Sequence, residues 1–145
     1  MNQNAMEMII QIEDKAEIER LLSILNIGLC VALEQGALSI EAAEHYLYSP
    51  YTLEMLQELD VSPKLLQVVH LGTELEDVES LLPEKLDESL AEMKQQSLEI
   101  LQTLSAADPD WQWVQTKPIA NALENLTNGK TTTARSATVY AKARP

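Results

Sequence analysis

One stretch of the chain combines the side chains that metal binding or acid–base chemistry requires. The sequence HLGTELEDVESLLPEKL, residues 70–86, holds one histidine, five acids and a run of leucines. Histidine and carboxylates are ligands for zinc and other divalent ions, and paired carboxylates can act as general acid and base. The same pattern also fits a helix with an apolar inner face and a charged outer face. The elements around the stretch must decide between these interpretations.

A metal site would need ligands from two separate parts of the chain. His70 and Glu74 are four residues apart, but we expect Gly72 to break the helix between them. Glu41 and His45 are also four apart, on one expected helix. A small metal-dependent enzyme that uses His45 and His70 with nearby carboxylates is therefore kept as an alternative. The leading expectation is that there are no catalytic residues, no cofactor and no bound metal.

Other catalytic motifs are missing from the sequence. It contains no Gly-rich phosphate loop and no nucleophile elbow. The only cysteine, Cys30, lies in the apolar run IGLCVAL, which predicts a buried and inert thiol. The start MNQNAMEM lacks the basic region of a secretory signal, and the apolar stretch 21–33 is shorter than the roughly 20 residues that span a bilayer. We therefore predict a non-catalytic, cytoplasmic protein.

The charge of the chain is strongly negative and unevenly distributed. The net charge is −13, and residues 1–116 hold 22 acids and 5 bases, whereas residues 117–145 hold 1 acid and 5 bases. Because an acidic surface repels phosphates, we expect neither nucleic acid nor membrane as a partner. Between residues 73 and 92, eight acids face one base, and a basic protein partner would relieve their repulsion. The predicted partner-binding residues are Glu74, Glu76, Asp77, Glu79, Glu84, Asp87, Glu88 and Glu92.

Local signals predict an all-α, single-domain array of about six or seven helices. Asp14 with Glu17 forms a capping box before a long, apolar helix that should be central and buried and should end at Gly36. Three short helices should follow, starting at Ser39, Ser49-Pro50 and Ser62-Pro63. Thr73 and Glu76 form another capping-box pattern, and a long helix should extend from Pro83 to about residue 104.

The two ends of the chain are less well defined by their patterns. MEMIIQIED at the N-terminus fits either a short strand or a helical lead-in, and residues 111–126 should form a last packed segment. After residue 128 the composition becomes basic and poor in large apolar residues. We therefore predict a helical domain over 1–128 and a flexible basic tail over 129–145, in which ATVYA could add a strand.

Two segments resemble a known family. ALEQGALSIEAAEHYLYSPYTLEMLQEL and HLGTELEDVESLLPEKL are similar to a family of small bacterial proteins recorded as a domain of unknown function, over roughly residues 16–101. This resemblance brings no established activity and no catalytic residues that could be carried over to the chain. In size and charge alone, the chain also resembles immunity proteins, which neutralise a cognate toxin domain.

We therefore expect an immunity-type inhibitor of a basic toxin. A homodimeric structural protein that pairs through residues 111–126 is the third interpretation.

Overall fold

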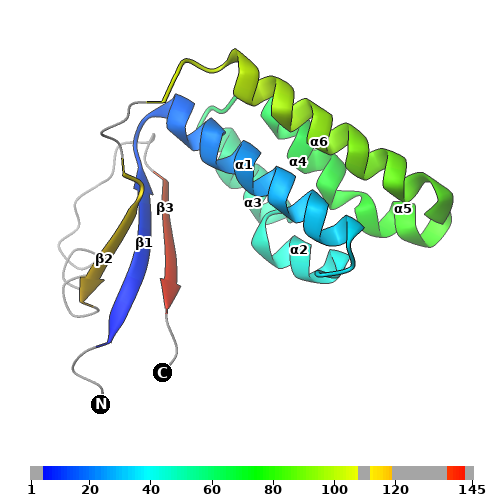
Figure 1. The fold of residues 1–145 in the computed structure, drawn as a ribbon, viewed down its shortest axis with the longest axis horizontal. Helices are drawn as coiled ribbons and strands as arrows, with labels where there is room; N and C mark the ends of the chain where they lie inside the picture. Colours follow the sequence, from blue (N-terminus) through cyan, green and yellow to red (C-terminus); the bar gives the residue numbers. More distant parts are fainter. Residues whose placement is uncertain (1–4, 108–111, 119–136, 143–145) are drawn as a thin grey trace.

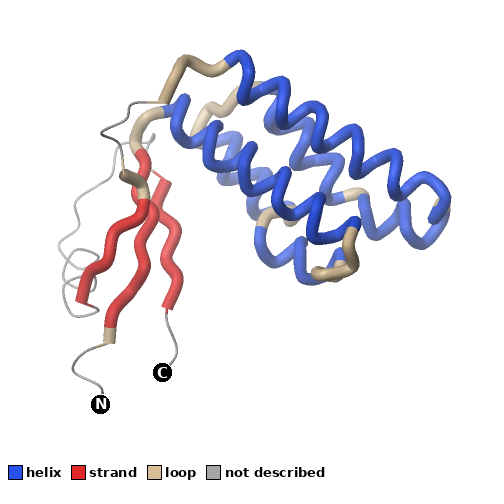
Figure 2. The backbone as a smooth tube through the Cα atoms, viewed as in Figure 1, coloured by secondary structure: helices blue, strands red, loops and turns tan. Residues whose placement is uncertain are grey.

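A computed structural model describes residues 5–107, 112–118 and 137–142 and shows a mostly helical chain with a small antiparallel sheet (Figures 1 and 2). The elements in chain order are β1 (Met6–Ile12), α1 (Lys15–Glu34), α2 (Ile40–Tyr46), α3 (Pro50–Glu58), α4 (Pro63–Thr73), α5 (Leu75–Leu81), the 3-10 turn η1 (Pro83–Lys85), α6 (Leu86–Thr103), β2 (Val114–Pro118) and β3 (Ala137–Lys142). The mostly helical character agrees with the predicted class, and the possible strands at the N-terminus and in the tail are present and form this sheet.

The first four helices begin where short polar side chains can bind their free N–H groups. The Asp14 carboxylate accepts a hydrogen bond from the Glu17 amide at 3.3 Å. The hydroxyls of Ser39, Ser49 and Ser62 accept from the amides three residues later, at 3.1–3.4 Å. Gly36, with φ of 70°, follows the last residues of α1 and reverses the chain. These predicted starts, and the predicted end of α1, are confirmed.

The predicted boundaries within residues 70–86 are wrong. Helix α4 continues through Gly72 to Thr73, and the Thr73 hydroxyl donates to the His70 carbonyl at 2.6 Å. Among the described residues no side chain caps α5, whose N-cap is Glu74, so the predicted capping box with Glu76 does not form. Pro83 begins a 3-10 turn, and α6 begins only at Leu86. The helices therefore do not divide as the sequence predicted.

Helices α1 and α6 lie side by side and antiparallel, with α3 and α4 behind them (Figure 1). A buried polar network joins them: Asn26 Nδ2 donates to Ser97 Oγ at 2.6 Å, and the Tyr48 hydroxyl donates to Asn26 Oδ1. Only one face of α1 is buried, because Ile24 and Val31 remain 47% and 44% exposed. The prediction that α1 is a central, buried helix is therefore wrong for its outward face.

Strand β1 lies between β2 and β3 and is antiparallel to both. Ile10 pairs with Val114 on one side and Val139 on the other. The N-terminal segment is thus a strand, and the predicted strand at ATVYA is present, so the sheet joins residues more than 100 positions apart. Within residues 111–126, 114–118 form β2 and 119–126 lie outside the described residues. The domain boundary at 128 and the flexibility of the tail stay predictions for the same reason.

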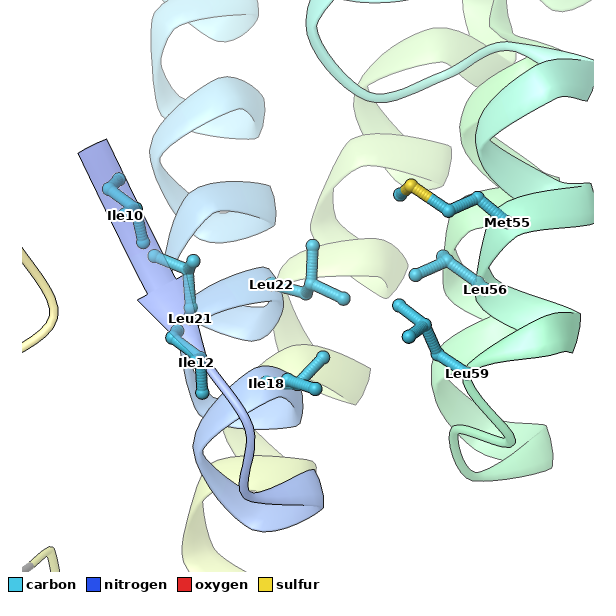
Figure 3. Close-up of a pocket in the computed structure, with 8 residues that line it drawn as sticks. All are labelled: Ile10, Ile12, Ile18, Leu21, Leu22, Met55, Leu56 and Leu59. Carbon is cyan, nitrogen blue, oxygen red and sulfur yellow. The ribbon is translucent and has the colours of Figure 1, made fainter. Parts of the chain in front are cut away.

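The sheet contacts the helices through the isoleucines at the end of β1. Ile10 and Ile12 face Leu21 and Ile18 of α1, and α3 lies across from them (Figure 3). The space between these elements is a wholly apolar cavity of about 40 Å³. A cavity of this size and polarity is a packing gap and not a ligand site, because ligand pockets measure roughly 300–1,000 Å³.

Candidate functional site

A larger cavity opens where the end of α1 meets α2, α5 and α6. Its volume is about 420 Å³, which lies within the range of ligand pockets. Three carboxylates line it: Glu41 from α2, and Glu76 and Glu79 from α5. Its apolar lining consists of Leu33, Leu38, Ile40, Leu86 and Leu90. We call this feature the acid-lined cavity.

Local sequence places each wall of the acid-lined cavity. The turn at Gly36 brings α2 back beside the end of α1, and the Ser39 cap starts α2 so that Glu41 lies in its first turn. Glu76 and Glu79 are three residues apart on α5 and therefore share one face of that helix. On α6, Leu86 and Leu90 share a face in the same way because they are four residues apart.

Carboxylates crowd the α2–α5 junction next to this cavity. Partial burial, a hydrogen bond with Glu76 and the negative charges of Glu76 and Glu41 together raise the pKa of the Glu44 carboxyl. Within the described part of the chain, the ion pairs involve other acids, and none includes Glu41, Glu44, Glu76 or Glu79. Within the described residues no ion pair therefore neutralises this junction, although the nearby His45 opposes the rise in the pKa of the Glu44 carboxyl.

The eight acids predicted from the sequence are all exposed, but they do not form one face. Only Glu76 and Glu79 line the cavity. Each of three others contacts a neighbour on the surface: Glu74 lies 3.5 Å from His70, Glu88 lies 3.3 Å from Lys85, and Glu92 accepts from Gln96 at 3.0 Å.

The acids of α6 also point in different directions. Asp87 and Glu92 are five residues apart, which places them about 140° apart around the helix axis. Glu84 lies on the exposed turn η1 that precedes α6. The acids of η1 and α6 are therefore not assembled with Glu76 and Glu79 into the cavity wall.

Sequence reasoning missed Glu41 and Glu44 as members of an acidic site. Glu41 was considered only as a metal ligand beside His45. Both acids follow the Ser39 cap, and that helix start was recognised. The sequence contains no signal that α2 packs beside α5, because this contact is made between segments about 30 residues apart. Only the structure joins the two pairs of acids.

The described residues do not provide the side-chain arrangement that a metal site or a reactive nucleophile would need. No three His, Cys, Asp or Glu side chains in the described ranges lie close enough to hold a metal ion. His45 and His70 are both exposed. Cys30 is fully buried, as predicted, and burial raises the pKa of its thiol, which disfavours the reactive thiolate.

No helix in the described residues combines the length and apolarity needed to cross a bilayer. No curated protein and no solved structure gives a significant match to the chain. Residues 13–115 match the model of a family described as "Protein of unknown function (DUF3969)". The chain therefore belongs to this family, and the matched range contains the whole acid-lined cavity.

Proposed function

We propose that this protein is a non-catalytic binding protein whose acid-lined cavity receives a basic segment of a partner protein. The observation that carries the proposal is the combination of an apolar lining with Glu41, Glu76 and Glu79 in one cavity of about 420 Å³. Partial burial, a hydrogen bond with Glu76 and the nearby charges of Glu76 and Glu41 raise the pKa of the Glu44 carboxyl beside this cavity, and such crowding of acids supports a cationic occupant. A cation there would stabilise the ionised carboxylates.

Lysine and arginine side chains match both parts of this cavity. Each has an apolar stem that can lie against leucine and isoleucine side chains, and a cationic head that remains near polar groups. The stem would contact Leu86 and Leu90, and the head would meet Glu76 and Glu79. Arginine can bind a carboxylate through two parallel hydrogen bonds, so a segment with arginine next to apolar residues is the best fit.

In its most specific form, the proposal is that the protein is an immunity-type inhibitor of a cognate toxin domain. Its support is the net charge of −13 and the small size of the chain, together with the acid-lined cavity. A toxin domain that acts on nucleic acid carries basic residues, and an acidic inhibitor can associate with it rapidly and cover those residues. Such a partner would bind without any chemical step on this chain.

The test compares two variants with the same loss of charge. Tagged wild-type protein is used to capture partners from a lysate of its own host at low salt. One variant replaces Glu41, Glu76 and Glu79 with glutamine. The control replaces Glu84, Glu88 and Glu92, which are exposed acids of η1 and α6 outside the cavity.

We expect one stoichiometric partner that is released by high salt, kept by the control variant and lost by the cavity variant. Capture that is insensitive to salt, or an equal loss in both variants, would exclude the acid-lined cavity as the binding site. Mass spectrometry then identifies the captured protein. A captured protein without a basic surface would exclude the toxin-inhibitor form of the proposal.

A further inference from the structure

Two consecutive leucines at the end of α5 are exposed beside the acid-lined cavity. Leu81 is 75% exposed and Leu82 is 51% exposed, and neither belongs to the described hydrophobic core. In the chain they lie between Glu79 and Leu86, which both line the cavity. A lone exposed leucine is common on protein surfaces, whereas an apolar patch bordered by charged residues indicates an interaction site.

The described contacts do not require apolar side chains at these two positions. The Leu82 amide donates to the Val78 carbonyl at 2.8 Å and ends α5, and the Leu82 carbonyl accepts from the Lys85 amide at 2.8 Å. These are backbone hydrogen bonds, which do not depend on the side chain. Side chains this exposed also bury little apolar area on folding. The apolar character of Leu81 and Leu82 is therefore not explained by the fold.

Leu82 continues the series of cavity acids along α5. Glu76, Glu79 and Leu82 follow one another at intervals of three residues, so each is next to the following one on the helix surface. Neighbours at this interval have Cβ atoms roughly 5–6 Å apart. Leu81 is adjacent and extends the apolar surface beyond this series. A ligand with a cation in the cavity can therefore reach the leucines with another part of the same segment.

We propose that Leu81 and Leu82 form an apolar anchor that binds a hydrophobic side chain of the basic partner segment while a cation of that segment occupies the acid-lined cavity. This inference rests on the proposed function and adds the requirement that the segment is amphipathic. Its cationic and apolar residues must share one side, so they are three or four positions apart in a helix or two apart in a strand.

Charge distinguishes this occupant from others that an apolar patch could bind. Asp77, Glu79 and Glu84 surround the leucines in the chain and are exposed. Lys85, a base in the same stretch, pairs with Glu88 at 3.3 Å. These acids repel an anionic membrane surface, and they also repel a second copy of a chain with a net charge of −13. A cationic and apolar segment is attracted by the acids and gains from burial of the leucines.

The test uses the purified full chain and two synthetic peptides of equal charge. In the first peptide, arginine and leucine alternate at intervals of three and four residues, and in the second, serine replaces every leucine. Binding of each labelled peptide is followed by fluorescence anisotropy at about 150 mM salt, where attraction between distant exposed charges is screened. We expect the leucine peptide to bind roughly tenfold more tightly, because only this peptide can bury the exposed leucines.

Two double variants locate the apolar contact on the protein. Leu81→Ser with Leu82→Ser should weaken binding of the leucine peptide by roughly tenfold and leave the serine peptide unchanged. The matched control is Ile24→Ser with Leu25→Ser, a consecutive pair on α1 that is 47% and 38% exposed and does not line the cavity. It should bind both peptides like wild type. Circular dichroism checks that the variants are folded, and the comparison of the two peptides on wild type requires no variant.

The outcomes separate this inference from the proposed function. Glutamine at Glu41, Glu76 and Glu79 should weaken binding of both peptides, because both carry the arginines. If it does so but wild type binds the two peptides equally, or if the two serine double variants behave alike, the apolar anchor is excluded and the cationic site remains. If neither peptide binds, or if the glutamine variant binds both like wild type, the cavity is excluded as a cationic site and the anchor is overturned with it.

Discussion

Replacing Gly72 with alanine should destabilise the protein, although alanine normally strengthens a helix. Gly72 is buried in α4, and a Cβ built on it would overlap the Cγ, Cδ1 and Cε1 atoms of the Tyr48 ring. The ring cannot move away freely, because Tyr48 is only 1% exposed and its hydroxyl donates to Asn26. The glycine of the HLGTELEDVESL stretch therefore makes room for an aromatic ring and does not end a helix.

The expected loss of stability is the balance of one favourable and two unfavourable contributions. Alanine gains about 0.5–1 kcal/mol of helix propensity. Overpacking of a filled core costs about 1–3 kcal/mol, and displacing the Tyr48 hydroxyl from Asn26 costs about 1–3 kcal/mol more. The packing and hydrogen-bond costs outweigh the propensity gain. We therefore expect Gly72→Ala to lower the free energy of unfolding by about 2–4 kcal/mol, a large share of the 5–15 kcal/mol typical of a domain.

The assay is urea unfolding followed by far-ultraviolet circular dichroism, with Gly28→Ala as the matched control. Both substitutions add one methyl group within a helix, but the space around Gly28 is open. Gly28→Ala should therefore raise the free energy of unfolding by about 0.5–1 kcal/mol. The slope with urea should stay unchanged in both variants.

A double-mutant experiment tests whether the destabilisation by Gly72→Ala arises from the Tyr48 ring. Tyr48→Leu shortens the side chain that faces Gly72, so the cost of Gly72→Ala should be smaller in this background than in wild type. We expect a coupling of at least about 1 kcal/mol between the two substitutions. Additive effects, or a Gly72→Ala variant within about 0.5 kcal/mol of wild type, would refute the reasoning that the ring occupies the space beside this glycine.

Three further predictions concern buried or crowded polar groups. Tyr48→Phe should lower the free energy of unfolding by about 1–3 kcal/mol in the same assay, because Asn26 Oδ1 then loses its donor inside the core. Glu19→Ala should cost about 1–3 kcal/mol because the carboxylate accepts from the Ser62 amide at 2.6 Å, whereas Glu19→Gln, which keeps an acceptor, should cost less. Glu44 has a raised pKa, so its contribution to stability is present below its ordinary value of 4.5 and is lost as the pH rises through its folded-state pKa. Glu44→Gln should therefore match wild type at low pH and exceed it in thermal stability at neutral pH, and a constant difference across the pH range would contradict this assignment.

The structure follows the sequence wherever a signal acts over a few residues. Asp14, Ser39, Ser49 and Ser62 each bind an amide three positions away, so the residues that start these helices also identify them. Such capping is local and does not depend on the rest of the fold. Gly36 likewise ends α1 through its own backbone conformation, with φ of 70°. These predictions needed no knowledge of tertiary contacts.

Long-range contacts account for what the sequence could not show. The sequence predicts a helix end at Gly72 because glycine often follows the last residue of a helix. Its actual role is to leave space for the ring of Tyr48, which is 24 residues earlier. Strand β3 pairs with β1 from more than 120 residues away, and alternation in β1 alone left a helix as an option. The acid-lined cavity combines Glu41 with Glu76 in the same way, so the acidity of α5 was visible and its counterpart on α2 was not.

Costly features with a compensating contact are structural, and costly features without one indicate an interaction outside the chain. Glu19 is a buried acid, but it receives the Ser62 amide, and Gly72 weakens a helix but accommodates the Tyr48 ring. Glu44 differs from these two, because it is partly buried beside the acids Glu76 and Glu41 and has no described ion pair. If binding of a basic segment lowers the pKa of the Glu44 carboxyl, this cost is explained by a partner. If the pKa of this carboxyl does not change on binding, the crowding of acids is unoptimised surface, and the proposed cationic occupant loses its physical basis.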